Sequence, residues 1–359
     1  MNVNKHIEQM NPEERRIHLV LVESAARRGA YKCWENKGWP MVAVPHMVNV
    51  TGACEQVDTL FNFDHFGEEG YLNQTGQTAL EISLTNPALA GVCTEIKSFR
   101  KEAKVDDRHL TEFSLLEFEG VYEEGEDGFD ILLNNIEGTI RSMIEGTLEN
   151  ATPSLEALGV NINFVKNLLT QPFARVEYDE AVKLVGKQWG EDLNQHDEQL
   201  IVQELGNGRP TFVMRYPEEI KFFNMKRDAN YKNPNTCNGN PHRVLSSDLL
   251  MPYSGECVGA AVREHNPVRL RERLLVSEMF RQLQVRGKGI EDFEEYLGAV
   301  EANPRPHAGC GIGMVRVIQS MMQTFDIRFA ATYLMNAGTG LKFSASYTPE
   351  VEKSVVLTV

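Results

Sequence analysis

The sequence SFRKEAKVDDRHLTEFSLLEFE, which spans residues 98–119, places arginine, glutamate, histidine and phenylalanine around one short charged segment. Residues 94–99 and 113–118 are rich in β-branched and aromatic side chains, whereas residues 101–107 are polar. This pattern predicts two strands joined by a loop. Guanidinium groups bind phosphate oxygens bidentately, and an aromatic ring stacks on a purine base. The stretch therefore indicates a nucleotide-binding hairpin, and the alternative is a surface hairpin with ordinary ion pairs.

The pattern FRxE, followed in register by RHLxEF, resembles motif 2 of the class II aminoacyl-tRNA synthetases, in particular the aspartyl and asparaginyl subgroup. By this resemblance Arg100 is a catalytic residue that binds the α-phosphate of ATP and the reacting carboxylate. Arg108 and His109 are expected to bind the outer phosphates, although His109 is also open to a role as general base. Phe113 is expected to stack on adenine, and Glu102 to contact the adenine amino group.

A second segment, GCGIGMVR at residues 309–316, resembles motif 3 of the same class, a glycine-rich strand that leads into a helix. Glycines let a backbone approach a ligand closely. The segment lacks the Lys-Ser/Thr ending of a phosphate-binding P-loop, so taken alone it is also compatible with a structural turn. The resemblance implies that Arg316 is catalytic and lies against the adenine and the terminal phosphate. Val315 departs from the family, which usually has glutamate at this position.

The sequence SDLLMPYSGECVGAAVRE, residues 247–264, resembles the asparaginyl segment DLxxPxxGExxGGSxRE. Its carboxylates Asp248 and Glu256 are of the kind that hold Mg²⁺ against nucleotide phosphates. Arg263 matches the arginine that grips the side chain of the amino acid, and its alternative role is a surface ion pair. The resemblance thus implies ATP as a substrate and Mg²⁺ as the metal.

The sequence YLNQTGQTALE, which ends at Glu81, resembles FLTVSGQLYLE, the family segment that lines the amino-acid pocket. Gln77 and Glu81 match its polar residues and are expected to bind the amino acid. Leu80 stands where the aspartyl enzymes carry a lysine that faces the substrate carboxylate, which favours the asparaginyl pattern. Ala260 and Ala261 stand where the family has glycine and serine, so the sequence leaves the identity of the amino acid open.

Helical and extended patterns follow one another without a regular βαβ order, which predicts an α+β fold with an antiparallel sheet flanked by helices. We expect one class II synthetase-like catalytic domain over residues 1–359, with a helical insertion at about residues 150–208. Pro45 is expected in a motif 1-like strand, and because motif 1 forms the subunit interface in this class, the resemblance implies a homodimer. Helices are predicted at residues 12–37, 132–148, 269–285 and 314–325.

The composition is that of an ordinary globular protein, with 42% apolar and 24% charged residues. The sequence has no apolar run of 18 residues and no signal-peptide pattern, so no membrane partner is expected. A cytoplasmic location is therefore expected, and in a reduced cytosol the six cysteines, which lack metal-site spacing, are expected to be free thiols. The net charge of −15 argues modestly against broad nucleic-acid affinity, because phosphate contacts need clustered lysine and arginine.

The expected reaction begins when an amino-acid carboxylate attacks the α-phosphorus of ATP. This step brings two anions together, so the site needs positive charge from Arg100 and Arg316. Mg²⁺ on Asp248 and Glu256 would supply the rest. The products are an aminoacyl-adenylate and pyrophosphate, and an acceptor then attacks the activated carbonyl. The expected enzyme is therefore an ATP-dependent, AMP-forming ligase.

The acceptor is the part of the reaction that the sequence leaves open. Only about ten residues precede the first predicted helix, so we expect no N-terminal OB-fold that reads an anticodon, and no tRNA acceptor without a separate anticodon-binding partner. The leading analogy is an asparagine synthetase-related group, in which ammonia attacks activated aspartate to give asparagine. The alternatives are transfer to tRNA, a carrier protein or a biosynthetic amine, and a non-catalytic regulatory paralogue.

Two further expectations concern the surroundings of the site. Residues 230–242, rich in asparagine, proline and glycine, are predicted to form a loop that closes over the amino acid. From Thr324 onward the chain departs from the FPRTPRN-like ending of the family, which leaves the closing of the ATP site open.

Overall fold

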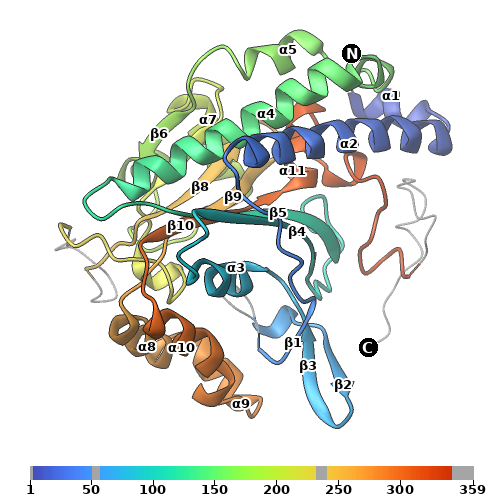
Figure 1. Cartoon of the computed structure of the whole chain (residues 1–359). Helices are drawn as coiled ribbons and strands as arrows, with labels where there is room; N and C mark the ends of the chain where they lie inside the picture. The colour runs from blue at the N-terminus through green and yellow to red at the C-terminus, as the bar shows by residue number, and fades with distance from the viewer. Residues whose placement is uncertain (1–2, 51–56, 232–240, 342–359) are drawn as a thin grey trace.

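The fold centres on a seven-stranded sheet (Figure 1), seen in a computed structural model that describes residues 3–50, 57–231 and 241–341. Neighbouring strands run antiparallel, except that β6 and β7 pair in parallel. This arrangement confirms the predicted α+β fold with a largely antiparallel sheet. In pairing order the strands are β4 (Gly91–Phe99), β5 (Glu112–Val121), β10 (His307–Gly313), β9 (Gly255–Val262), β8 (Ser246–Met251), β7 (Thr211–Met214) and β6 (Ala174–Glu177).

Two long helices, α2 (Pro12–Asn36) and α4 (Gly128–Ala157), lie side by side across one face of the sheet (Figure 1). The side chain of Asn11 caps the first backbone N–H groups of α2, and a proline with helix-compatible φ follows it. The helices approach closely at Gly29, because a Cβ there would lie 2.2 Å from the carbonyl oxygen of Ser142. Their apolar faces and the facing side chains of the sheet form the main core. These two helices do not cover the opposite face of the central strands, and that face is available for a binding site.

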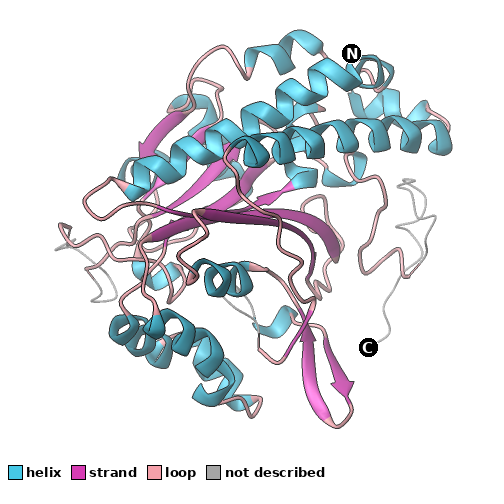
Figure 2. Cartoon of the chain, in the orientation of Figure 1, coloured by secondary structure: helices cyan, strands magenta, loops and turns pink. Residues whose placement is uncertain are grey.

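The other helices surround this frame. Helix α3 and the group α8, α9 and α10 lie on the side of the sheet away from α2 and α4 (Figure 2). No described helix is both long and apolar enough to cross a membrane. The helices that surround the frame of sheet, α2 and α4 are α1 (Val3–Gln9), α3 (Gln77–Leu84), α5 (Ile162–Asn167), α6 (Tyr178–Val185), α7 (Gln195–Glu204), α8 (Pro267–Val276), α9 (Glu278–Val285), α10 (Glu294–Ala302) and α11 (Met314–Met321). A smaller sheet pairs β1 (Met47–Val48), β3 (Glu68–Leu72) and β2 (Asn62–His65) in that order.

Strands β4, β5 and β10 bring the two nucleotide motifs together. The predicted hairpin is confirmed, since β4 and β5 pair from Gly91 opposite Gly120 to Phe99 opposite Glu112. The predicted glycine-rich strand that leads into a helix is also confirmed, as β10 followed by α11. Because β10 pairs with β5 on one side and β9 on the other, segments far apart in the sequence become neighbours.

Other expectations differ from the structure in detail. The single helix predicted at residues 269–285 is wrong, because Ser277 has an extended backbone and its hydroxyl caps the start of α9. Pro45 lies before β1 and outside any strand. Residues 150–208 contain α5, α6 and α7, but also β6, which extends the main sheet. Most of the loop predicted at residues 230–242 lies outside the described residues.

Candidate active site

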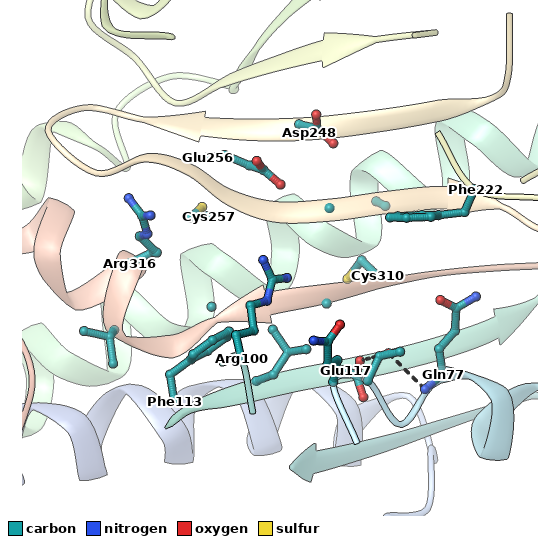
Figure 3. A pocket seen from close by; sticks show the side chains of 18 of the residues that line it. Gln77, Arg100, Phe113, Glu117, Phe222, Asp248, Glu256, Cys257, Cys310 and Arg316 are labelled. Carbon is teal, nitrogen blue, oxygen red and sulfur yellow. Dashed lines mark hydrogen bonds between the residues drawn. The ribbon is translucent and has the colours of Figure 1, made fainter. Parts of the chain in front are cut away.

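A cavity of about 220 Å³ opens on the sheet face opposite α2 and α4 (Figure 3). Side chains alternate between the two faces of a strand, so Leu116 and Phe118 of β5 enter the core while Leu115, Glu117 and Glu119 line the cavity. The motifs recognised in the sequence therefore meet at one place. The predicted site residues that line this cavity are Gln77, Arg100, Arg108, His109, Phe113, Asp248, Glu256, Arg263 and Arg316.

Arg100 and Phe113 stand together at the end of the β4–β5 hairpin. The backbone N–H of Arg100 donates to the carbonyl oxygen of Thr111 (2.8 Å), which closes the hairpin at the cavity. The guanidinium carbon lies 5.7 Å from the centre of the Phe113 ring, and Figure 3 shows the side chain pointing from Phe113 toward Glu256. A cation and an aromatic face are thus placed where a phosphate and a base can bind. Glu102 is not among the described residues that line the cavity.

Arg316, in the first turn of α11, is held by backbone carbonyl groups. Its guanidinium donates to the carbonyl oxygens of Ser254 (2.7 Å) and Arg108 (2.8 Å). These contacts fix the side chain although Val315 replaces the glutamate that is usual in the family. Burial, and then the nearby charge of Arg108, lower the pKa of Arg316 to about 10. A bound anion would relieve both effects, so this corner suits a phosphate group.

Asp106, which the sequence analysis did not single out, organises the hairpin loop. Its carboxylate accepts hydrogen bonds from the backbone N–H groups of Arg108 and His109 (2.9 Å each) and contacts Nδ1 of His109 (2.8 Å). Burial opposes ionisation, but these contacts outweigh it and lower the pKa of Asp106 to about 2. Arg108 also pairs with Glu198 of α7 (3.1 Å). An aspartate in a polar loop is the sequence signal for such a turn, because its side chain bonds backbone N–H groups two or three residues on.

Asp248 on β8 and Glu256 on β9 supply two carboxylates to the cavity (Figure 3). Lys221, which the sequence analysis also missed, donates to both oxygens of Asp248 (3.0 and 2.7 Å). Mg²⁺ prefers oxygen ligands and, with a nucleotide, needs only one or two protein carboxylates. The described part of the chain holds no group of three or more histidine, cysteine or acidic side chains placed to bind a metal. Glu256 is therefore suited to an Mg²⁺ ion that arrives with ATP, and Asp248 would join it once the ion displaces Lys221.

A buried ion pair joins Arg263 to Glu119 in the cavity lining. Arg263 donates from Nε (3.0 Å) and Nη2 (2.7 Å) to Oε1 of Glu119, and only 4% and 1% of these side chains are exposed. The other oxygen, Oε2, is buried and has no hydrogen-bond partner among the described residues. Gly309 is required beside it, because a Cβ there would lie 2.2 Å from Cδ of Glu119. The cavity thus presents a buried acceptor beside a guanidinium group, an arrangement that a hydrogen-bond donor would stabilise.

Glu81 lies behind the cavity, and the described lining does not include it. Its carboxylate accepts hydrogen bonds from Gln77 (2.5 Å) and Tyr296 (2.8 Å) and contacts Nε2 of His307 (3.2 Å). Burial disfavours charge on both partners, but their contact lowers the pKa of Glu81 and raises the pKa of His307. Glu81 therefore holds Gln77 in place at the cavity wall.

Glu117 is a second buried carboxylate in the lining. It accepts hydrogen bonds from the backbone N–H of Gly76 (2.7 Å) and the hydroxyl of Thr75. Burial is the main reason that the pKa of Glu117 rises to about 7.

Leu80 also lines the cavity. The wall is thus apolar at the position where the aspartyl pattern has a lysine.

The fold and the cavity define the class of protein: the family described as tRNA synthetases class II (D, K and N) matches residues 4–337, and the chain belongs to this family. It is 34% identical over 302 residues to the asparagine-tRNA ligase of Pyrococcus horikoshii, which covers 82% of this chain and 63% of that protein. It is 29% identical over 332 residues to the asparagine-tRNA ligase of Streptococcus sanguinis, with 89% and 68% covered. The chain thus spans less than two thirds of the length of its Pyrococcus relative.

Solved structures agree with this assignment. The asparaginyl-tRNA synthetase of Pyrococcus horikoshii complexed with asparaginyl-adenylate matches with a TM-score of 0.76 and 31% identity, over 90% of this chain and 69% of that one. The asparaginyl-tRNA synthetase of Entamoeba histolytica matches with a TM-score of 0.71 and 25% identity, over 89% and 68%. The resemblance inferred from the motifs is therefore confirmed, and it points to the asparaginyl branch.

Proposed function

We propose that this protein is an ATP-dependent, AMP-forming ligase. It activates aspartate, asparagine or a close analogue as an aminoacyl-adenylate and transfers the aminoacyl group to a nitrogen nucleophile instead of tRNA. The observation that carries the proposal is that Arg100, Arg316 and the carboxylates Asp248 and Glu256 line one cavity. The arginines offset the charge of a triphosphate and a carboxylate as these approach each other. When bound, Mg²⁺ would add further positive charge against the phosphates.

The residues of the chain would bind and orient the reactants. Arg100 reaches over Phe113 and would contact the α-phosphate and the attacking carboxylate, while the ring stacks on adenine. Arg316, already desolvated, would bind the terminal phosphate. Gln77, held by Glu81, would contact the amino acid on the other side of the cavity. The carboxylate then displaces pyrophosphate in line, so the chain needs no covalent nucleophile.

Ammonia is the first acceptor to consider. Its attack on aspartate that is adenylated at the side-chain carboxylate would give asparagine and AMP. The net charge of −15 supports a small acceptor over tRNA, because a polyanion binds best where lysine and arginine cluster. A small neutral nucleophile would meet no such electrostatic cost.

The Glu119–Arg263 pair favours a second candidate, the activation of asparagine. Oε2 of Glu119 would accept a hydrogen bond from the side-chain amide, and Arg263 would donate to the amide oxygen. A carboxylate side chain would instead face the like charge of Glu119. The Pyrococcus relative was solved with asparaginyl-adenylate. If asparagine is the amino acid that is activated, the acceptor is an organic amine and not ammonia.

The proposal includes a homodimer in the cytoplasm. Helix α2 exposes Ile17 (56%), Val20 (44%) and Leu21 (49%) at helical spacing. Such an apolar strip is typical of a surface that is covered by a partner. A second copy of the chain is the partner that the motif 1 resemblance predicts.

Amino-acid-dependent ATP–pyrophosphate exchange by the purified chain, measured across the twenty amino acids, tests the proposal. Exchange with aspartate, followed by asparagine formation when ammonia is added, supports the first candidate. Exchange with asparagine supports the second. Formation of a stable aminoacyl-tRNA from added tRNA would contradict the proposed transfer to a nitrogen nucleophile. The absence of exchange with every amino acid would favour a non-catalytic regulatory paralogue.

A further inference from the structure

A second cavity, of about 640 Å³, adjoins the first. The two cavities share Lys221, Phe222, Asp248 and Glu256 as lining residues. The second cavity continues between residues 218–223 and helices α8 and α9. A molecule bound there would lie beside Asp248 and Glu256, the carboxylates that the proposed function assigns to Mg²⁺.

Ion pairs occupy the arginines of this second cavity. Arg227 and Arg273 pair with Glu218 (2.7 and 2.9 Å). Arg281 pairs with Glu278 (3.3 Å). Arg227 and Arg273 share one carboxylate, but the lining as a whole has six carboxylates against four basic side chains, so it is net acidic and does not favour a phosphate group.

Two other carboxylates of the lining, Asp192 and Glu219, form no ion pair with any residue that the structure describes. Oε1 of Glu219 is buried, and no donor within the described ranges reaches it. A buried carboxylate oxygen without a donor is costly, and a cationic ligand would offset that cost. The same charge repels a phosphodiester chain.

We propose that this second cavity binds the acceptor, and that the acceptor is an organic amine with a second cationic group, such as an aliphatic diamine. The inference rests on the proposed function, because it specifies the nitrogen nucleophile of that reaction. Size is compatible with it, because a cavity of about 640 Å³ admits a molecule much larger than ammonia. One nitrogen would reach toward Lys221 and Asp248 while the distal cation contacts Glu219.

The transfer balances without any further reactant. The neutral amine nitrogen attacks the carbonyl carbon of the aminoacyl-adenylate and forms a C–N bond. The bond between the carbonyl carbon and the phosphate oxygen breaks, and AMP leaves with that electron pair. The protons that the amine gives up pass to water. The product is an amide of the amino acid.

The test compares nucleophiles on the full chain with ATP, Mg²⁺ and the amino acid that supports exchange. Hydroxylamine is small enough to reach the adenylate whether or not the second cavity binds an amine. It converts the adenylate into a hydroxamate, so the amount of hydroxamate measures adenylate formation. Putrescine, butylamine and ammonium chloride are then compared by AMP release. We expect putrescine to exceed butylamine and ammonia at least tenfold in kcat/KM, since only putrescine carries a distal cation.

Glu219→Gln is expected to raise the KM for putrescine about tenfold, and Glu272→Gln, on the exposed side of α8, serves as the matched control. Hydroxamate formation by the Glu219→Gln variant shows whether the first cavity still works. Equal rates with putrescine and butylamine, or an unchanged KM in Glu219→Gln, would overturn the inference while hydroxamate formation upholds the proposed function. The absence of hydroxamate would overturn both.

Discussion

Arg263 donates two hydrogen bonds to a single oxygen of Glu119, and no donor in the described part of the chain reaches the second oxygen. Removing the arginine alone would leave a buried carboxylate uncompensated, which typically costs about 3–5 kcal/mol. A loss of activity in such a variant would therefore not distinguish binding from folding. A substitution of Glu119 is therefore more informative than a substitution of Arg263.

We expect Glu119→Gln to shift the choice of amino acid from asparagine toward aspartate. The substitution keeps the shape of the side chain but removes its negative charge, so Arg263 becomes able to pair with a substrate carboxylate. The ratio of kcat/KM values in pyrophosphate exchange should move at least tenfold toward aspartate. Glu301→Gln, at an exposed position of α10, should leave the ratio unchanged. If Glu119→Gln also leaves it unchanged, the pair does not read the substrate side chain.

Arg100→Ala should lower ATP–pyrophosphate exchange by about a hundredfold or more, because the charge that develops at the α-phosphate loses its main partner. The fold should persist, since the Arg100 side chain lies at the cavity and the hydrogen bond that closes the hairpin comes from its backbone N–H, which alanine keeps. The melting temperature and the exchange rate would be compared with those of Arg269→Ala, an exposed arginine of α8. Unchanged exchange in Arg100→Ala would remove this residue from the proposed mechanism.

Glu256→Gln should raise the Mg²⁺ concentration needed for half-maximal exchange about tenfold. The change removes one of the two carboxylates assigned to Mg²⁺, and Mg²⁺ binding depends on the charge of its oxygen ligands. A titration of exchange rate against Mg²⁺ at fixed ATP would measure the shift. The same Mg²⁺ requirement in wild type and variant would place the metal elsewhere.

The Glu117 carboxyl makes the protein less stable as pH rises. Its pKa is about 7 in the folded chain against an ordinary value of 4.5. Between these values the unfolded chain releases a proton that the folded chain keeps, so the free energy of unfolding falls as pH increases. At about 1.4 kcal/mol per pKa unit, the loss is on the order of 3 kcal/mol. Glu117→Gln should remove this contribution, and urea unfolding of both proteins at pH 5 and pH 8 would show it. Parallel pH dependence would contradict a raised pKa.

Leu21→Glu should convert a dimer into a monomer. The charge would be placed in the exposed apolar strip of α2, where covering it with a partner becomes unfavourable. Sedimentation velocity of wild type and variant would measure the change. Val268→Glu alters a similarly exposed apolar residue (64%) on α8, on the other side of the sheet, and should leave the dimer intact. A monomeric wild-type protein would refute the dimer proposal.

The hairpin and the glycine-rich strand were predictable because their information is local. Strand propensity, loop polarity and residue spacing all lie within residues 98–119 and 309–316. The same local information failed at Ser277, where one hydroxyl ends the continuity of a helical pattern by capping the next helix. Neighbouring apolar residues continue the pattern through that break, so periodicity alone does not reveal it.

The residues missed in the site are those whose roles depend on long-range contacts. Lys221 and Asp248 meet only because residue 221 folds back over β8. Glu81 matches a pocket residue in the sequence, yet the structure turns it toward His307 and Tyr296. The two alanines at the family's glycine and serine positions face opposite sides of β9. Ala260 borders the cavity but packs in the main core, whereas Ala261 lies opposite Gly309, on the face of Arg263, and packs with Val244.

The pairing of β5 with β10 also sets when the site can form during synthesis. His307 lies opposite Val121, so β5 lacks this neighbour until residues 122–307 have been made. At roughly 5–20 residues per second, translation of the intervening segment takes about 10–40 s. Throughout that interval the nascent hairpin has an open strand edge, the kind of surface that invites aggregation and that chaperones cover. The cavity is therefore completed late on the ribosome, and release of a chain cut short before Arg316 would yield a hairpin without the arginine that lines the cavity beside it.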